Sequence, residues 1–162
     1  MKKLDFIFRR VSVRRFQPKD VDDSTISLIL EAGNSAPSAR NLQARDFVVV
    51  RGKETREALA RAAGGQKSIA EAPVIIVVCA NPQRSGSSGE RGKFYAEIDA
   101  AVSAENILLT ASVLGLGAVW VGGFDEGEVA SVLGIPVRPV ALIPMGYPAE
   151  EPVRKERFPQ RC

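Results

Sequence analysis

The hydrophobic positions of this chain form short apolar runs separated by longer stretches with helical spacing. Two β-branched runs, residues 47–50 and 74–79, predict strands, and the second is apolar on both faces and so predicts a central strand. Shorter apolar runs at residues 118–121 and 140–144 predict two more strands. The pattern therefore predicts one sheet of four strands with helices between them.

The longest helical segment, residues 95–114, contains no Gly or Pro and is apolar nearly all round, which predicts a buried helix about 30 Å long. Its polar residues fall at helical spacing on one face and need partners if the helix is buried. They are Asp99, Ser103, Asn106 and Thr110. Further helices are predicted at residues 4–10, 25–34, 53–63, 68–72 and 125–133.

The order of elements predicts a small α/β or α+β fold, and residues 1–162 form one domain without internal repeats or linkers. No GxGxxG follows the first strand and no Walker sequence occurs, so a nucleotide would have to be held in another way. Residues 81–93, rich in Gly and Ser, are expected to be the most flexible stretch.

Charge adds one feature to this picture. The net charge is only +3, from 22 basic and 19 acidic residues, and no stripe of Lys and Arg with interleaved aromatics appears, which argues against nucleic-acid binding. The basic residues gather near the two ends of the chain. These are Arg9, Arg10, Arg14 and Arg15 at one end, and Arg154, Lys155 and Arg157 at the other. The two clusters either meet around one anion or are ordinary solvated surface charge.

The chain contains no histidine, which excludes catalytic triads that need imidazole and the common His-ligated metal sites. We therefore expect no metal and assign no catalytic residue. Cys79 lies in an apolar run and is expected to be buried and inert, and Cys162 is the last residue. No signal peptide or membrane-spanning run is visible, so a cytoplasmic location without membrane contact is expected.

Several short motifs follow one another along almost the whole chain. They are RVSVRRF at 10–16, PSARNLQ at 37–43, Ala72-Pro73, Tyr95 with Asp99, GLG at 115–117 with WVGGF at 120–124, and GYP at 146–148 with Lys155-x-Arg157-x-Pro159. In this order the motifs resemble those of the nitroreductase family of FMN-dependent enzymes. The resemblance implies an α+β fold with a central, mostly antiparallel sheet flanked by helices. It also implies an intertwined homodimer with two FMN sites at the interface, beside the helix at 95–114.

By the same resemblance, the cofactor-binding residues are Arg10, Val11, Ser12, Arg14, Pro37, Ser38, Ala39, Asn41, Gln43, Gln66, Val121, Gly122, Gly123, Lys155 and Arg157. Arg10 and Ser12 would surround the FMN phosphate together with Lys155 and Arg157. Guanidinium groups suit that role because their fork matches phosphate oxygens.

The remaining placements concern the flavin ring. Arg14 would lie near its pyrimidine edge, and Gln66 would hydrogen-bond O4 or N3 of the same ring. The backbone at 122–123 would cross the ring and direct an N–H at N5. The residues of the 37–43 loop would come from the second subunit, and the tail at 149–162 is expected to pack on the partner.

The function implied by the resemblance is transfer of hydride from NADH or NADPH to flavin N5 and of electrons to a small acceptor such as a nitroaromatic or quinone. Two alternatives stay open: a flavin-fragmenting, dehalogenating or azole-oxidising relative, and a flavin store or sensor without turnover. The chain departs from the family pattern at Ala39, at Ala44-Arg45 in place of Pro-Trp, and at residues 84–93, which replace the usual cover over the flavin.

Overall fold

The computed structural model of the chain describes residues 4–154 and residue 156. Its sheet has four strands in the order β1-β2-β4-β3, and all three pairings are antiparallel. The strands are β1 (Arg45–Val50), β2 (Val74–Ala80), β3 (Gly117–Ala118) and β4 (Arg138–Gly146). The predicted α+β fold with a central antiparallel sheet is confirmed.

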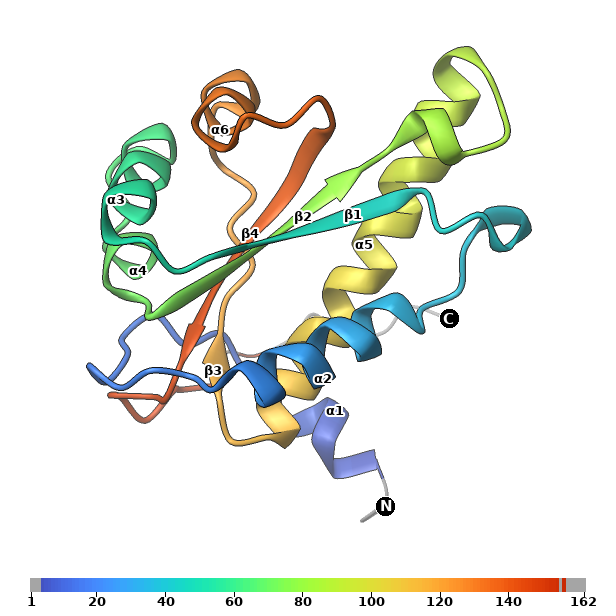
Figure 1. The fold of residues 1–162 in the computed structure, drawn as a ribbon. Coiled ribbons are helices and arrows are strands. Elements are labelled where there is room, and N and C mark those ends of the chain that lie inside the picture. The colour runs from blue at the N-terminus through green and yellow to red at the C-terminus, as the bar shows by residue number, and fades with distance from the viewer. Residues whose placement is uncertain (1–3, 155, 157–162) are drawn as a thin grey trace.

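Helices cover both faces of the sheet. They are α1 (Asp5–Arg9), α2 (Asp23–Asn34), α3 (Lys53–Ala62), α4 (Lys67–Glu71), α5 (Gly89–Val113) and α6 (Glu126–Leu133), with short 3-10 turns η2 (Ala39–Asn41) and η3 (Pro82–Arg84). In Figure 1, α2 and α5 lie on one side of the sheet, and α3, α4 and α6 lie on the other. The sheet is therefore the middle of three layers.

Strand β2 is buried at every position, as its apolar sequence predicts. Side chains alternate between the two faces of a strand, so β2 contributes to two separate hydrophobic clusters. Val74, Ile76 and Val78 pack with residues of α2 and α5. The intervening residues of β2 pack with α3, α4 and α6. Strand β2 thus contributes apolar side chains to the hydrophobic clusters on both faces of the sheet.

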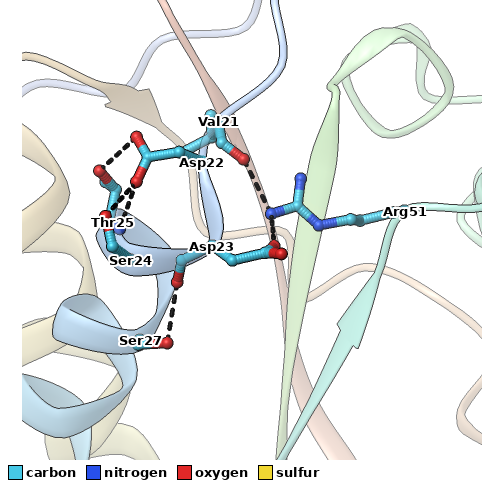
Figure 2. A network of polar contacts seen from close by, with 7 residues as sticks. All are labelled: Val21, Asp22, Asp23, Ser24, Thr25, Ser27 and Arg51. Carbon is cyan, nitrogen blue, oxygen red and sulfur yellow. Dashed lines mark hydrogen bonds and ion pairs between the residues drawn. The ribbon is translucent and has the colours of Figure 1, made fainter.

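The start of α2 is fixed by a polar network (Figure 2). Asp22 caps the helix: its Oδ1 accepts from the Thr25 backbone N–H at 2.8 Å and from the Ser24 hydroxyl at 2.5 Å. These hydrogen bonds lower the pKa of Asp22 below its usual range, and the bond from Ser24 has the largest effect. Arg51, just past β1, donates through Nη2 to the Val21 carbonyl at 2.8 Å and to Asp23 Oδ1 at 2.7 Å. The network joins the start of α2 to the end of β1.

The segment expected to be the most flexible, residues 81–93, is instead largely ordered into η3 and the first turn of α5, which starts at Gly89. Its glycines serve close packing: a Cβ added at Gly92 would lie 2.2 Å from the Ser87 carbonyl oxygen. Ser85 is buried, and its hydroxyl donates to the Pro82 carbonyl at 2.7 Å. Glycine and serine here reflect a tight turn and not a disordered chain.

The third strand also differs from its prediction. Only Gly117 and Ala118 form β3, not residues 118–121. The chain still follows β4 to Val121, whose N–H and carbonyl pair with Leu142 at 2.9 and 3.0 Å. Strand β4 is longer than the predicted 140–144 because its pairing with β2 begins at Arg138.

Candidate active site

The N-terminal strip, defined here as residues 10–17, lies between β3 and the chain that follows β4. Ser12 forms a parallel bridge with Ala118, and the Val13 N–H donates to the Ala118 carbonyl at 3.0 Å. The Gln17 N–H donates to the Tyr147 carbonyl at 2.8 Å. Backbone pairs at both ends of the strip therefore fix its position.

Glu150 completes the anchoring of this strip. Its Oε1 accepts from the backbone N–H of Arg14 at 2.7 Å and of Arg15 at 3.2 Å. Because both bonds use backbone donors, the Arg14 and Arg15 guanidinium groups remain exposed. Glu150 is not among the site residues expected from the sequence. The only signal for it is an acidic residue shortly after the 146–148 turn, which is visible only once that turn is known to pack on the strip.

A pocket of about 480 Å³ opens beside the strip. It is lined by Arg14, Arg15, Gln66, Lys67, Ser68 and Glu71. Arg14 and Gln66, which are distant in sequence, thus face one cavity. Gln66 precedes α4 and follows Gly64 and Gly65, whose φ values of 69° and 79° belong to the left-handed region that favours glycine. The turn made by these two glycines sets where Gln66 enters the pocket.

The backbone at Gly122 and Gly123 is exposed just after the segment that follows β3 stops pairing with β4. A Cβ at Gly123 would have no neighbouring atom within 4 Å, whereas one at Gly122 would lie 3.2 Å from Trp120 Nε1. The preceding residue, Val121, is buried and paired with β4. Val121 is thus held by its pairing with β4, and the backbone that follows it is open to close approach by a flat group.

The 37–43 loop lies elsewhere. In Figure 1 this loop, which contains η2, lies at the right and is well separated from the blue N-terminal strip at the lower left. Ser38 Oγ accepts from the Gln43 N–H at 3.0 Å, and Gln43 Nε2 donates to Asn41 Oδ1 at 2.6 Å. The five expected cofactor-binding residues of this loop therefore do not meet Arg14 and Gln66 within one chain.

The polar face of α5 finds partners inside this chain. Asp99 accepts two backbone N–H groups from the 37–43 loop and its end, and the Ser103 hydroxyl donates to the Asp99 carbonyl at 2.8 Å. Asn106 Nδ2 donates to the Ala32 carbonyl of α2 at 3.0 Å. These three residues need no second subunit to satisfy their hydrogen bonds.

The expected cofactor-binding residues near the two ends of the chain divide into two groups. Arg10, Val11 and Ser12 are half-buried at the start of the strip. Lys155 and Arg157 lie outside the described residues. Of the tail, Ala149 donates through its N–H to the Arg15 carbonyl at 2.9 Å, so its first residues pack on this chain's own strip. The expectation that residues 149–162 pack on a partner does not describe these first residues, and for the rest of the tail it stays a prediction.

Among residues 4–154 and 156, no group of three His, Cys, Asp or Glu side chains is placed to hold a metal ion. No helix in this part of the chain is long and apolar enough to cross a membrane. Cys79 is fully buried, and burial raises the pKa of its thiol to about 12, so it is un-ionised and inert at neutral pH as expected.

Comparison with known proteins gives these features a context. The sequence pattern of the nitroreductase family matches residues 7–69 and 60–147. A candidate NADH dehydrogenase/NAD(P)H nitroreductase of Methanothermobacter thermautotrophicus is 36% identical, over 98% of this chain and 83% of its own length. An FMN reductase [NAD(P)H] of Bacillus subtilis is 29% identical, over 93% of this chain and 68% of its own.

A solved structure shows the same architecture. The NADPH:FMN oxidoreductase of Vibrio harveyi, in complex with NAD⁺, superimposes with a TM-score of 0.92 at 28% identity, covering 98% of this chain and 74% of that one. The family pattern spans the strip, the Gln66 turn and α4, which are the elements that line the pocket. The chain belongs to the nitroreductase family.

Proposed function

We propose that this protein is an FMN-dependent oxidoreductase that takes hydride from NADH or NADPH and reduces a small acceptor, such as a nitroaromatic or a quinone. The observation that carries the proposal is the pocket in which Arg14 and Gln66 come together. It is supported by family membership and by relatives named FMN reductase [NAD(P)H] and NADPH:FMN oxidoreductase. When bound, FMN would supply the N5 atom that accepts hydride and passes electrons on.

The residues present fit this cofactor. A flat ring needs a stretch of backbone that can be approached closely, and the open space around Gly123 provides one. A pyrimidine edge needs a donor, an acceptor and a cation. Gln66 supplies the first two through its amide, and Arg14 supplies the third. The phosphate would be held by Arg10 and Ser12, and by Lys155 and Arg157 of the tail.

In the proposed reaction the protein positions and stabilises, and no side chain transfers a proton. The guanidinium of Arg14 would stabilise the negative charge that collects at the pyrimidine edge on reduction. The N–H of Gly122 or Gly123 would orient N5. Since the chain has no histidine, we expect hydride transfer from NAD(P)H to vary only a few-fold from about pH 6 to about pH 8.5.

We also propose that two chains form each site. The support is the distance between the strip and the 37–43 loop within one chain, and an apolar surface on α1 and α5. Large apolar side chains are exposed there, at Leu4, Phe6, Ile7, Phe8, Ile98 and Val113. Large apolar side chains exposed on two helices that contact each other are typical of a surface between subunits. A homodimer would cover it and bring the loop of one chain to the strip of the other.

The test uses purified protein reconstituted with FMN. Heat-released flavin is identified by mass, and NADH and NADPH oxidation is followed with and without an added nitroaromatic or quinone. Release of FMN together with acceptor-dependent oxidation is the expected result. Failure to hold FMN after reconstitution would overturn the proposal. FMN binding without acceptor-dependent turnover would favour the flavin store or sensor.

A variant pair sharpens the same test. Arg14→Ala is expected to slow single-turnover flavin bleaching by NAD(P)H, because the cation beside the pyrimidine edge is lost. Arg61→Ala removes an exposed cation on α3, outside the Arg14 pocket, and serves as the matched control. An unchanged rate in Arg14→Ala would mean that Arg14 does not face the flavin. A tenfold bell-shaped pH profile would show that a protein group does transfer a proton.

A further inference from the structure

The 37–43 loop has a strained backbone. Arg40, Asn41 and Gln43 have φ values of 54°, 56° and 45°, in the left-handed region that non-glycine residues seldom adopt. Such residues keep this geometry only where surrounding contacts hold it. Strain of this kind is concentrated at functional sites. Two buried side chains, one from α5 and one from β1, supply such contacts.

One of these side chains is Asp99, which reaches the loop from α5. It is 2% exposed, and its two oxygens bond two different parts of the loop. Oδ1 accepts from the Ala39 N–H at 3.0 Å, and Oδ2 accepts from the Ala44 N–H at 3.1 Å. The carboxylate thus joins the beginning of the turn to the residue that follows its end. An amide could not replace it, because one of its two atoms would be a donor facing a donor.

The second side chain is Arg45, at the start of β1, which is 3% exposed. Its Nη2 donates to the Asn34 carbonyl at 2.5 Å and to the Ala36 carbonyl at 3.0 Å, on the chain that enters the loop. Its Nε and Nη1 are buried without a hydrogen-bond partner among the described residues. A buried guanidinium in this condition is costly, and burial lowers its pKa, whereas the negative charge of Asp99 acts in the opposite direction.

The two side chains act on complementary groups. Asp99 binds N–H groups of the loop, and Arg45 binds carbonyl groups of the segment leading into it. The short turn η2 leaves these backbone groups without partners in a helix or sheet, and Asp99 and Arg45 supply those partners. We propose that Asp99 and Arg45 are positioning residues that hold the 37–43 loop, before cofactor binds, in the conformation that contacts FMN. This rests on the proposed function for the identity of the ligand, and on the geometry above for the holding of the loop.

The first measurement needs no cofactor and no variant. Amide hydrogen exchange of the apo protein should show the Ala39 and Ala44 N–H groups protected to a degree comparable with α5, although neither donates to a helix or sheet carbonyl. Exchange at the rate of a free loop would overturn the proposal. This measurement also stays informative if the variants below fail to fold, and if the protein proves not to bind FMN.

The second measurement uses Asp99→Asn and Arg45→Met, with Arg45→Lys as the conservative variant. In apo Asp99→Asn, exchange of residues 34–44 should accelerate at least about tenfold while β2 stays protected. FMN affinity should fall about tenfold, as expected when a preorganised loop must be reordered on binding. Arg45→Lys keeps a cation able to donate to both carbonyls and should recover part of the affinity that Arg45→Met loses.

The control is Asn106→Ala, which removes another side-chain bond made by α5, to the Ala32 carbonyl of α2 and not to the loop. It should leave loop exchange and FMN affinity unchanged. A double-mutant cycle completes the test: Asp99→Asn with Arg45→Met should weaken FMN little more than the larger single change, since both act through one loop. Faster exchange of residues 34–44 with unchanged FMN affinity would overturn the proposal. So would losses of FMN affinity that add fully in the double variant.

Discussion

The N-terminal strip and the 37–43 loop carry most of the proposed cofactor contacts, yet the chain secures them in different ways. The strip is held chiefly by backbone pairs with β3 and with the residues after β4. The loop is held by side chains, above all those of Asp99 and Arg45. A backbone pair survives most substitutions, whereas a buried charged contact fails when one partner changes. The strip should therefore tolerate sequence change far better than the loop.

The largest effect is expected from a complementation experiment that tests whether the two regions serve one site across subunits. A chain with Arg14→Ala and Gln66→Ala is co-expressed with a chain carrying Asp99→Asn, and differently tagged heterodimers are purified. One site then combines an intact strip with an intact loop, so at an FMN concentration near the wild-type dissociation constant the heterodimer should bind about half as much FMN as wild type, and each homodimer clearly less. Occupancy is read from flavin absorbance per dimer.

The matched control places all three changes in one chain, paired with wild-type chain. Each site of that heterodimer then has one damaged region, so occupancy should stay low. If strip and loop served a site within the same chain, the two heterodimers would give the reverse result. That reversal would contradict the proposed dimer.

The next effect concerns how closely the strip is packed on β3. A Cβ at Gly117 would lie 2.6 Å from the Val13 side chain, so Gly117→Ala should displace the strip and weaken FMN about tenfold, or about 1.4 kcal/mol. Hydrogen exchange of the 37–43 loop should not change. Gly52→Ala, where the Cβ would meet only Thr55 Oγ1 at 3.5 Å, is the control for glycine replacement. Full FMN affinity in Gly117→Ala would mean that the strip does not contact the cofactor.

A smaller effect is expected at Glu150. Its Oε1 accepts from two backbone N–H groups, and Glu150→Ala should cost about 1 kcal/mol in FMN binding, roughly fivefold, as Arg14 becomes less well placed. Glu150→Gln keeps an oxygen acceptor and should stay within about twofold of wild type. The FMN dissociation constant, from flavin fluorescence quenching, measures both. Equal losses in the two variants would show that charge, and not the hydrogen bonds, is what matters at Glu150.

The smallest effect concerns the sheet that carries both regions. The folded-state pKa of Cys79 is raised to about 12 by burial, whereas an unfolded thiol ionises near about 8.5. The contribution of the buried thiol to the free energy of unfolding is therefore complete well below about pH 8.5, and it declines as the pH rises toward the folded-state pKa. Between pH 8.5 and pH 9, wild type should lose about 0.4 kcal/mol more than Cys79→Ala, measured by urea unfolding. Parallel pH profiles would show that Cys79 ionises in the folded protein.

Much of the fold follows from the sequence because it depends on periodicity. The apolar run of β2 and the helical spacing of α2, α5 and α6 are local signals, and each predicts an element that is present, although α5 begins at Gly89 and not at residue 95. Residues 81–93 were misjudged because glycine and serine are common both in flexible chain and in tight packing. Only the approach of Gly92 to the Ser87 carbonyl distinguishes the two, and that contact is not visible in composition.

The candidate site was predictable only in part. Arg14 and Gln66 were assigned from the family resemblance, and the structure places both on one pocket. The contacts that secure these motifs were not foreseen, because Glu150 meets Arg14 across 136 residues and Asp99 meets Ala39 across 60. Arg45 was noted only as a departure from the family pattern. Contacts of this range depend on the whole fold, so no local pattern reveals them.

Helix α5 joins the two regions in a single rigid body. Asp99, which holds the loop, lies on it, and Gly117, which packs on the strip, follows its C-terminal end. One residue inserted between them would rotate Asp99 by about 100° relative to β3 and detach its carboxylate from Ala39 and Ala44. Four inserted residues would nearly restore its direction but move it by about 6 Å. The length of this segment is therefore constrained by the two regions that it connects, in addition to the constraint that core packing places on its buried residues.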